Sequence, residues 1–153
     1  MHIEPGSEAT RILLVEDDAD DVFLLTHALS RRLERAKVQV TRNGREALDY
    51  LSAFASIDEP GCPSLVILDL NMPFLDGHGL LMAIRRDEEL RGLPVIVMTG
   101  VENHDSVRRA YHDGASAVVR KPRTMDEMGE IIDSIIDFWF NTAQPPRGDV
   151  VQV

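Results

Sequence analysis

This sequence of 153 residues is poor in several features that would point to particular classes of protein. Its one cysteine, Cys62, excludes an internal disulfide and a cysteine-rich zinc site. No apolar run approaches the roughly 18 residues of a membrane span, and the polar segment Met1–Thr10 lacks the apolar core of a signal peptide. Basic residues are outnumbered, with 16 Lys+Arg against 26 Asp+Glu, and form no patch that would attract a phosphate backbone. We therefore expect a cytoplasmic protein that binds neither nucleic acid nor membranes.

Short apolar runs alternate five times with helical patterns along the chain. The apolar runs are Arg11–Val15, Lys37–Thr41, Ser64–Asp69, Pro94–Thr99 and Ser116–Val119. The helical patterns lie near Asp20–Glu34, Gly44–Ala55, Gly77–Leu90, Asn103–Asp113 and Thr124–Asn141. This alternation is typical of βαβ units that build a parallel sheet. We expect a flexible leader over 1–10, one α/β domain over 11–142 and a C-terminal tail or dimerisation arm over 143–153.

The composition of each apolar run indicates its place in the sheet. The first, third and fourth runs are continuously apolar, as strands covered by helices on both faces are. Lys37–Thr41 alternates between polar and apolar residues, and Ser116–Val119 is short, so we expect both at edges. These assignments favour a flavodoxin-like, doubly wound parallel sheet with the strand order 2-1-3-4-5.

Reactive side chains follow the strands at the edge where such sheets bind ligands, outside the carboxyl ends. Glu16 and Asp17 follow the first run, Asp69 and Thr99 end the third and fourth, and Lys121 follows the fifth. Carboxylates gathered closely repel one another unless a cation neutralises them, and Mg²⁺ with oxygen ligands is the cation we expect. With that cation and the lysine stabilising the developing charge, Asp69 is a candidate nucleophile for an aspartyl-phosphate.

Each of these residues also has a purely structural interpretation. The acidic run Glu16–Asp21 suits the N-terminus of a helix, Thr99 suits the end of a buried strand, and Lys121 suits a solvated surface. Asp69 is different, because an unpaired acid in an apolar strand is costly. The convergence of all these features at one edge of the sheet favours a functional site.

With these residues in place, the sequence resembles the receiver domain of two-component response regulators. The resemblance spans roughly Arg11 to Asn141. Its motifs are Ile12-Leu13-Leu14-Val15-Glu16-Asp17, Leu68-Asp69-Leu70-Asn71-Met72-Pro73 with Asp76-Gly77, and Val97-Met98-Thr99-Gly100 with Lys121-Pro122. Each motif alone is weak, but their order and domain-scale spacing make the set specific.

The resemblance implies a phosphoryl-transfer site with a bound cation. Asp69 would accept a phosphoryl group from a partner sensor histidine kinase. Asp17 and Asp69 would bind Mg²⁺ directly, Glu16 would bind it through water, and Asn71 would contribute its backbone carbonyl. These four residues are the expected metal site.

The resemblance also assigns roles to the residues around the phosphoryl group. Thr99 would hydrogen-bond the phosphoryl oxygens and Lys121 would form an ion pair with them. The Lys121-Pro122 peptide bond would be cis, and Gly77 would permit a tight turn after the third strand. One position departs from the family pattern, because Val118 stands three residues before the lysine, where a Tyr or Phe is usual. The usual rotating aromatic readout of phosphorylation is therefore in doubt.

The last helical pattern is apolar around more of its circumference than one sheet contact needs. Its apolar arc is about 200° wide, whereas a helix packed on one face needs roughly 100°. The surplus lies around Ile132, Ile136 and Phe140, next to Trp139, and we expect these residues to form an interface. The aromatic end and the following Pro145-Pro146 resemble the small standalone receivers paired with bacterial phytochromes. That resemblance implies a homodimer through the last helix and tail, with a bacteriophytochrome as a candidate kinase.

We therefore expect a single-domain response regulator that signals through protein contacts and is not an enzyme. One alternative is a dimeric receiver scaffold that works without phosphorylation. A second is a Mg²⁺-dependent phosphohydrolase with an aspartyl-phosphate intermediate. Such enzymes commonly place a second Asp two residues after the nucleophile as general acid, and Asn71 cannot donate a proton in that way. Flavin binding is the remotest alternative, because no Gly-rich or Ser/Thr-rich phosphate loop follows the first strand.

Overall fold

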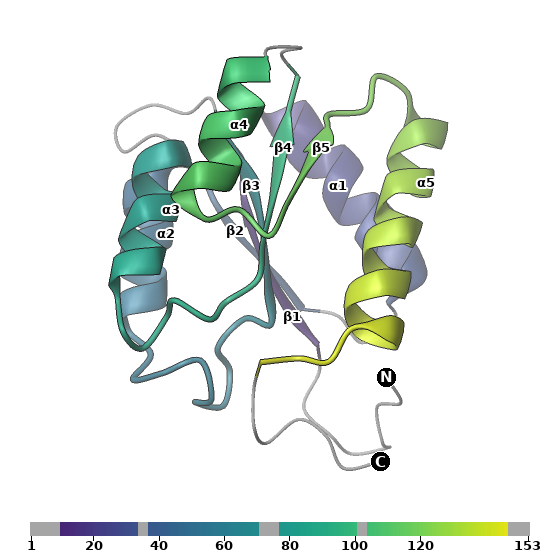
Figure 1. The fold of residues 1–153 in the computed structure, drawn as a ribbon. Helices are drawn as coiled ribbons and strands as arrows, with labels where there is room; N and C mark the ends of the chain where they lie inside the picture. The colour runs from purple at the N-terminus through teal and green to yellow at the C-terminus, as the bar shows by residue number, and fades with distance from the viewer. Residues whose placement is uncertain (1–9, 34–36, 71–76, 101–103, 147–153) are drawn as a thin grey trace.

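The fold is a five-stranded parallel sheet between two layers of helices (Figure 1). The computed structural model describes residues 10–33, 37–70, 77–100 and 104–146. The strands are β1 (Arg11–Val15), β2 (Lys37–Thr41), β3 (Leu65–Asp69), β4 (Val95–Thr99) and β5 (Ala117–Arg120). They are ordered β2-β1-β3-β4-β5, which confirms the flavodoxin-like order expected from the sequence.

Burial along the strands follows the apolar pattern of the sequence. Every residue of β3 and β4 is buried, and so are the last four residues of β1, because helices cover both faces of these strands. The edge strand β2 alternates between exposed and partly buried residues. The parallel register pairs Val15 with Thr41 and with Leu68, and Thr99 with Arg120. The carboxyl ends of all five strands therefore meet at one edge of the sheet.

A helix follows each strand, and for three of these helices the residue before the first turn caps the helix with its side chain. They are α1 (Ala19–Arg32), α2 (Gly44–Ser52), α3 (Gly77–Arg86), α4 (His104–Asp113), α5 (Met125–Ile136) and the π-helical turn η1 (Asp137–Thr142). Asp18, Asn43 and Thr124 each accept a hydrogen bond from the backbone N–H three residues later. Such a cap stabilises a helix by about 1 kcal/mol.

Two apolar cores lie on opposite faces of the sheet. Figure 1 shows the helices that cover them, with α2, α3 and α4 on one face and α1 and α5 on the other. Leu13 and Val15 point to the core formed with α2, α3 and α4, whereas Ile12 and Leu14 point to the core formed with α1 and α5. This division follows from the strand period of two, which sends successive side chains to opposite faces.

The apolar surplus on the last helix, where we expected an interface with a partner, is buried within the chain. Ile132, Ile136 and Phe140 are only 0%, 2% and 5% exposed. The physical reason is that α5 packs on the sheet and also against α1, so it needs a wider apolar arc than one contact requires. The exposed aromatic side chain here is Phe138, at 51%, and its ring packs edge-on against partly buried Trp139.

The structure also bears on several expectations about single residues and short segments. No cis peptide bond occurs among the described residues, so the expected cis Lys121-Pro122 bond is wrong, and the trans form is the lower-energy one for most such bonds. Thr10 is buried and its carbonyl accepts from the N–H of Lys37, so it belongs to the folded domain. The rest of the expected leader, 1–9, lies outside the described residues. No helix in the described ranges is long and apolar enough to cross a membrane.

Gly77 is required by a close approach of two backbone segments. A Cβ at this position would lie 2.5 Å from the Cα of Leu70 and 2.7 Å from the carbonyl oxygen of Asp69. The first residue of α3 is thereby packed directly on the end of β3, which carries Asp69. The glycine is needed for space at this contact, and the expected conformational freedom in a turn is not what the structure uses.

We predict that Gly77→Ala lowers the free energy of unfolding by about 1–3 kcal/mol, the usual cost of overpacking a tight contact. The matched control is Gly129→Ala in α5, where a Cβ would meet no atom within 4 Å. That control should raise stability by roughly 0.5–1 kcal/mol, because glycine is unfavourable inside a helix. Urea denaturation of both variants measures the difference. Equal stability of the two variants would contradict the close-approach explanation.

Candidate functional site

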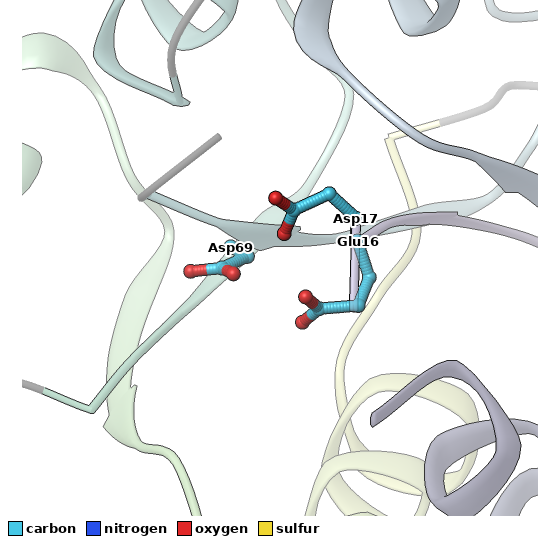
Figure 2. Close-up of side chains that lie close together, drawn as sticks. All are labelled: Glu16, Asp17 and Asp69. Atoms are coloured by element: carbon cyan, nitrogen blue, oxygen red, sulfur yellow. The ribbon is translucent and has the colours of Figure 1, made fainter. Parts of the chain in front are cut away.

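Three carboxylates converge at the carboxyl ends of two neighbouring central strands. Glu16 and Asp17 directly follow β1, and Asp69 is the last residue of β3. One ligand oxygen from each side chain lies within 4.8 Å of the other two. Figure 2 shows the three side chains gathered in one place. Glu16 and Asp69 are buried, at 1% and 7% exposure, whereas Asp17 is exposed. The group is therefore open to solvent on the side of Asp17.

Lys121 provides the positive charge at this cluster. It follows β5, and its backbone N–H donates to the carbonyl of Thr99 at 2.9 Å. Its Nζ lies 2.9 Å from Glu16 Oε2, 2.8 Å from Asp21 Oδ2 and 3.3 Å from Asp69 Oδ2. The ammonium group thus contacts three carboxylates that come from three different parts of the chain.

Burial and hydrogen bonding act in opposite directions on the pKa values of Glu16 and Lys121, and both pKa values are raised. Burial raises the pKa of the Glu16 carboxyl from 4.5 to about 7, against the lowering effect of its hydrogen bond to Lys121. The negative charge of Asp69 adds to the increase. Burial alone would lower the pKa of Lys121, but its hydrogen bonds to Asp21 and Glu16 outweigh burial and raise it. Lys121 therefore stays protonated, while Glu16 titrates near neutral pH.

The structure describes some, but not all, of the remaining residues expected at the site. Thr99 is the last residue of β4 and is 4% exposed, at the same edge of the sheet as Asp69. Asn71 lies outside the described residues. Val118 on β5 donates its backbone N–H to the hydroxyl of Tyr111 on α4 at 3.1 Å. An aromatic side chain thus reaches Val118 from α4, although β5 itself lacks one at this position.

Asp21 is the site residue that sequence reasoning missed. It lies in the first turn of α1, where the acidic run Glu16–Asp21 suggested helix capping. That interpretation holds for Asp18, whose Oδ1 accepts from the N–H of Asp21 at 3.0 Å. The side chain of Asp21 instead pairs with Lys121. Nothing in the sequence separates Asp21 from its neighbour Asp20, because only the orientation of α1 decides which of them reaches the lysine.

Residues 12–133 match the model of the response regulator receiver domain. The chain belongs to this family. The matched range contains the carboxylate cluster, Thr99 and Lys121, and the structure has the receiver strand order. Receiver domains are signalling modules of two-component systems, which agrees with the resemblance read from the motifs.

Two curated relatives and one further solved structure are similar over most of the receiver domain. The probable methanogenesis regulatory protein FilR2 of Methanothrix harundinacea is 34% identical over 88% of this chain and 86% of its own. Response regulator Rcp1 of Synechocystis sp. is 30% identical over 88% of this chain and 92% of its own. The phosphorylated cyanobacterial phytochrome response regulator RcpA is 31% identical, with a TM-score of 0.82 over 90% of this chain and 99% of that chain.

The donor set of this receiver domain fits a hard divalent cation. Carboxylate oxygens are the preferred ligands of such ions, and three of them lie within reach of one another here. The solved structure of Rcp1 in its Mn²⁺-bound form is 29% identical to this chain, with a TM-score of 0.79 over 90% of this chain and 99% of that chain. Within the part of the chain that the structure describes, Glu16, Asp17 and Asp69 are the group that could hold a metal ion.

We predict a pH dependence of stability that comes from Glu16. In the cation-free protein its folded pKa, about 7, lies above its ordinary 4.5, so the folded state binds the proton more tightly than the unfolded chain does. This contribution is present below about pH 4.5 and is lost as pH rises through about 7. The loss is on the order of 3 kcal/mol, since the pKa rises from 4.5 to about 7 and one pKa unit corresponds to about 1.4 kcal/mol.

The measurement is urea denaturation in a chelator at several pH values between 4.5 and 8, for the wild type and Glu16→Gln. The stability difference between the two proteins should move in favour of Glu16→Gln as pH increases. A difference that does not change with pH would contradict the raised pKa.

Proposed function

We propose that this protein accepts a phosphoryl group on Asp69 from a partner sensor histidine kinase, in a reaction that requires Mg²⁺. The observation that carries the proposal is the position of Asp69, within ligand reach of Glu16 and Asp17 and 3.3 Å from the Lys121 ammonium. A carboxylate oxygen of Asp69 would attack phosphorus, and the bond from phosphorus to the kinase histidine nitrogen would break. The electron pair of that bond would go to the imidazole.

The residues around Asp69 would divide the work of positioning and charge stabilisation. Glu16, Asp17 and Asp69 would hold Mg²⁺, with the backbone carbonyl of Asn71. When bound, the ion would neutralise charge that develops on the transferring phosphoryl oxygens. Lys121 would pair with these oxygens, and the Thr99 hydroxyl would donate a hydrogen bond to them.

The proposed role is that of a phosphoacceptor and switch, without catalytic turnover. Fast hydrolysis of the aspartyl-phosphate needs a general acid or base near the phosphorus. The position two residues after Asp69 is occupied by Asn71, which cannot serve as that acid. This residue argues against the phosphohydrolase alternative and for a phosphorylated state that lasts long enough to signal through protein contacts.

The test of this function is incubation with Mg²⁺ and acetyl phosphate, followed by intact mass. Wild-type protein should gain one phosphoryl group, whereas Asp69→Asn should gain none, because an amide oxygen is a poor nucleophile. Excess chelator should abolish the gain in the wild type. A gain that persists in folded Asp69→Asn would place the phosphoacceptor elsewhere and contradict the proposal.

We further propose that the protein is a homodimer through the C-terminal part of α5 and η1, and that its kinase is a bacteriophytochrome. The similarity to RcpA, a cyanobacterial phytochrome response regulator, supports the photoreceptor partner. The aromatic pair Phe138–Trp139 supports the dimer contact, since its ring centroids are 5.2 Å apart and Phe138 is half exposed. An exposed aromatic ring beside a partly buried one offers apolar area for such a contact.

We predict that Phe138→Ser converts the dimer to a monomer in analytical ultracentrifugation, because the variant removes the exposed ring from the contact. Phe23→Ser is the matched control, since Phe23 on α1 is 65% exposed and lies on a different helix. The control should sediment as the wild type does. A monomeric wild type, or a dimer that survives Phe138→Ser and is lost in Phe23→Ser, would overturn the proposed contact.

A further inference from the structure

Asp21 makes the shortest contact to the Lys121 ammonium. The distance from Nζ to Asp21 Oδ2 is 2.8 Å, compared with 2.9 Å to Glu16 and 3.3 Å to Asp69. The side chains of Lys121 and Asp21 are only 18% and 28% exposed, so water screens the pair incompletely. The pair connects the first turn of α1 to the segment that follows β5.

The other two partners of Lys121 belong to the group that could hold a cation. Glu16 and Asp69 are members of that group, and Asp21 is not. A divalent cation and the lysine ammonium would draw on the same two carboxylate groups, those of Glu16 and Asp69. Asp21 is therefore the partner whose hold on Lys121 does not compete with cation binding.

We propose that Asp21 is a positioning residue that holds the Lys121 ammonium beside Asp69 when a divalent cation occupies the carboxylate cluster. The inference rests on the proposed phosphoacceptor function and adds to it a residue that acts through the lysine. Asp21 keeps the ammonium available to the incoming phosphoryl group while Glu16 and Asp69 turn to the cation.

The local structure allows the role of the Asp21 side chain to be separated from the role of its backbone. Its N–H is capped by Asp18, so the start of α1 does not depend on the Asp21 carboxylate. Asp20 is its exposed neighbour in the same turn and makes no ion pair with Lys121. Asp20→Asn therefore removes the same charge from the same helical turn and is the matched control for Asp21→Asn.

Loss of the Asp21 carboxylate has two expected consequences. Without it, Lys121 pairs more strongly with Glu16 and Asp69 and competes with the cation, so Mg²⁺ affinity should fall about three- to tenfold. At saturating Mg²⁺ the ammonium is no longer held in place, so the rate of phosphorylation by acetyl phosphate should fall by a similar factor. Asp20→Asn should change both quantities by less than about twofold, the effect of a solvent-exposed charge.

A spectroscopic measurement tests the position of the ammonium directly. The chain has two lysines, Lys37 and Lys121, so their side-chain ammonium signals in ¹⁵N-labelled protein are easily assigned. In the Mg²⁺-loaded wild type and in Asp20→Asn, Lys121 should give a signal protected from exchange with water. Asp21→Asn should lose that signal. A protected signal that persists in Asp21→Asn, or one that is absent from the wild type, would overturn the inference.

Calorimetric Mg²⁺ titration and a double-mutant cycle with Lys121→Met complete the test. In the Lys121→Met background, Asp21→Asn and Asp20→Asn should have equal effects on Mg²⁺ affinity, because the lysine through which Asp21 acts is gone. A difference that survives in this background would contradict the inference. If the wild type takes up no phosphoryl group, the proposed function fails, and the ammonium signal with the Mg²⁺ titration still decides the role of Asp21.

Discussion

The repulsion among carboxylates crowded around one ammonium group is the constraint on which this structure depends. Glu16, Asp21 and Asp69 all lie within 3.3 Å of Lys121 Nζ, and Asp17 completes the cluster on the solvent side. One positive charge cannot neutralise this set, and burial, together with the negative charge of Asp69, raises the pKa of Glu16. A divalent cation would restore the balance, and in the proposed function a phosphoryl group would then meet two centres of positive charge beside the carboxylate of Asp69.

The fold creates this crowding because parallel strands end at the same edge of the sheet. β1 and β3 are adjacent, and β5 belongs to the same sheet. Residues at the carboxyl ends of these strands therefore meet although they are far apart in the sequence, and no long loop has to bring them together. Helices cover both faces of the sheet and bury its central strands. Asp69 is therefore a buried acid at the end of an apolar strand. The tight packing of Gly77 on the end of β3 fixes the strand terminus that carries Asp69.

Most of this arrangement can be predicted from the sequence, because it depends on the periodicity of apolar residues and on which residues adjoin the strands. Continuous and alternating apolar runs predict the strand order. Because Glu16, Asp69 and Lys121 stand at or directly after strand ends, the sequence also predicts that they meet. Side-chain orientation on helices is harder to predict. Asp20 and Asp21 are identical in type, and only the packing of α1 makes one of them a partner of the lysine. The burial of Ile132 and Ile136 likewise depends on α1 as a second neighbour of α5. The wide apolar arc of α5 predicts a second contact, but it does not say that the contact is with α1 of the same chain.

The most direct test of the central claim is to locate the acyl phosphate by chemistry. Protein phosphorylated in the presence of Mg²⁺ is reduced with borohydride, which converts an aspartyl-phosphate to homoserine, and peptides are then sequenced by mass spectrometry. We expect homoserine at position 69, and none when Mg²⁺ is withheld. Homoserine at another acidic residue, or none at all in folded protein that binds Mg²⁺ and has been given phosphodonor, would contradict it.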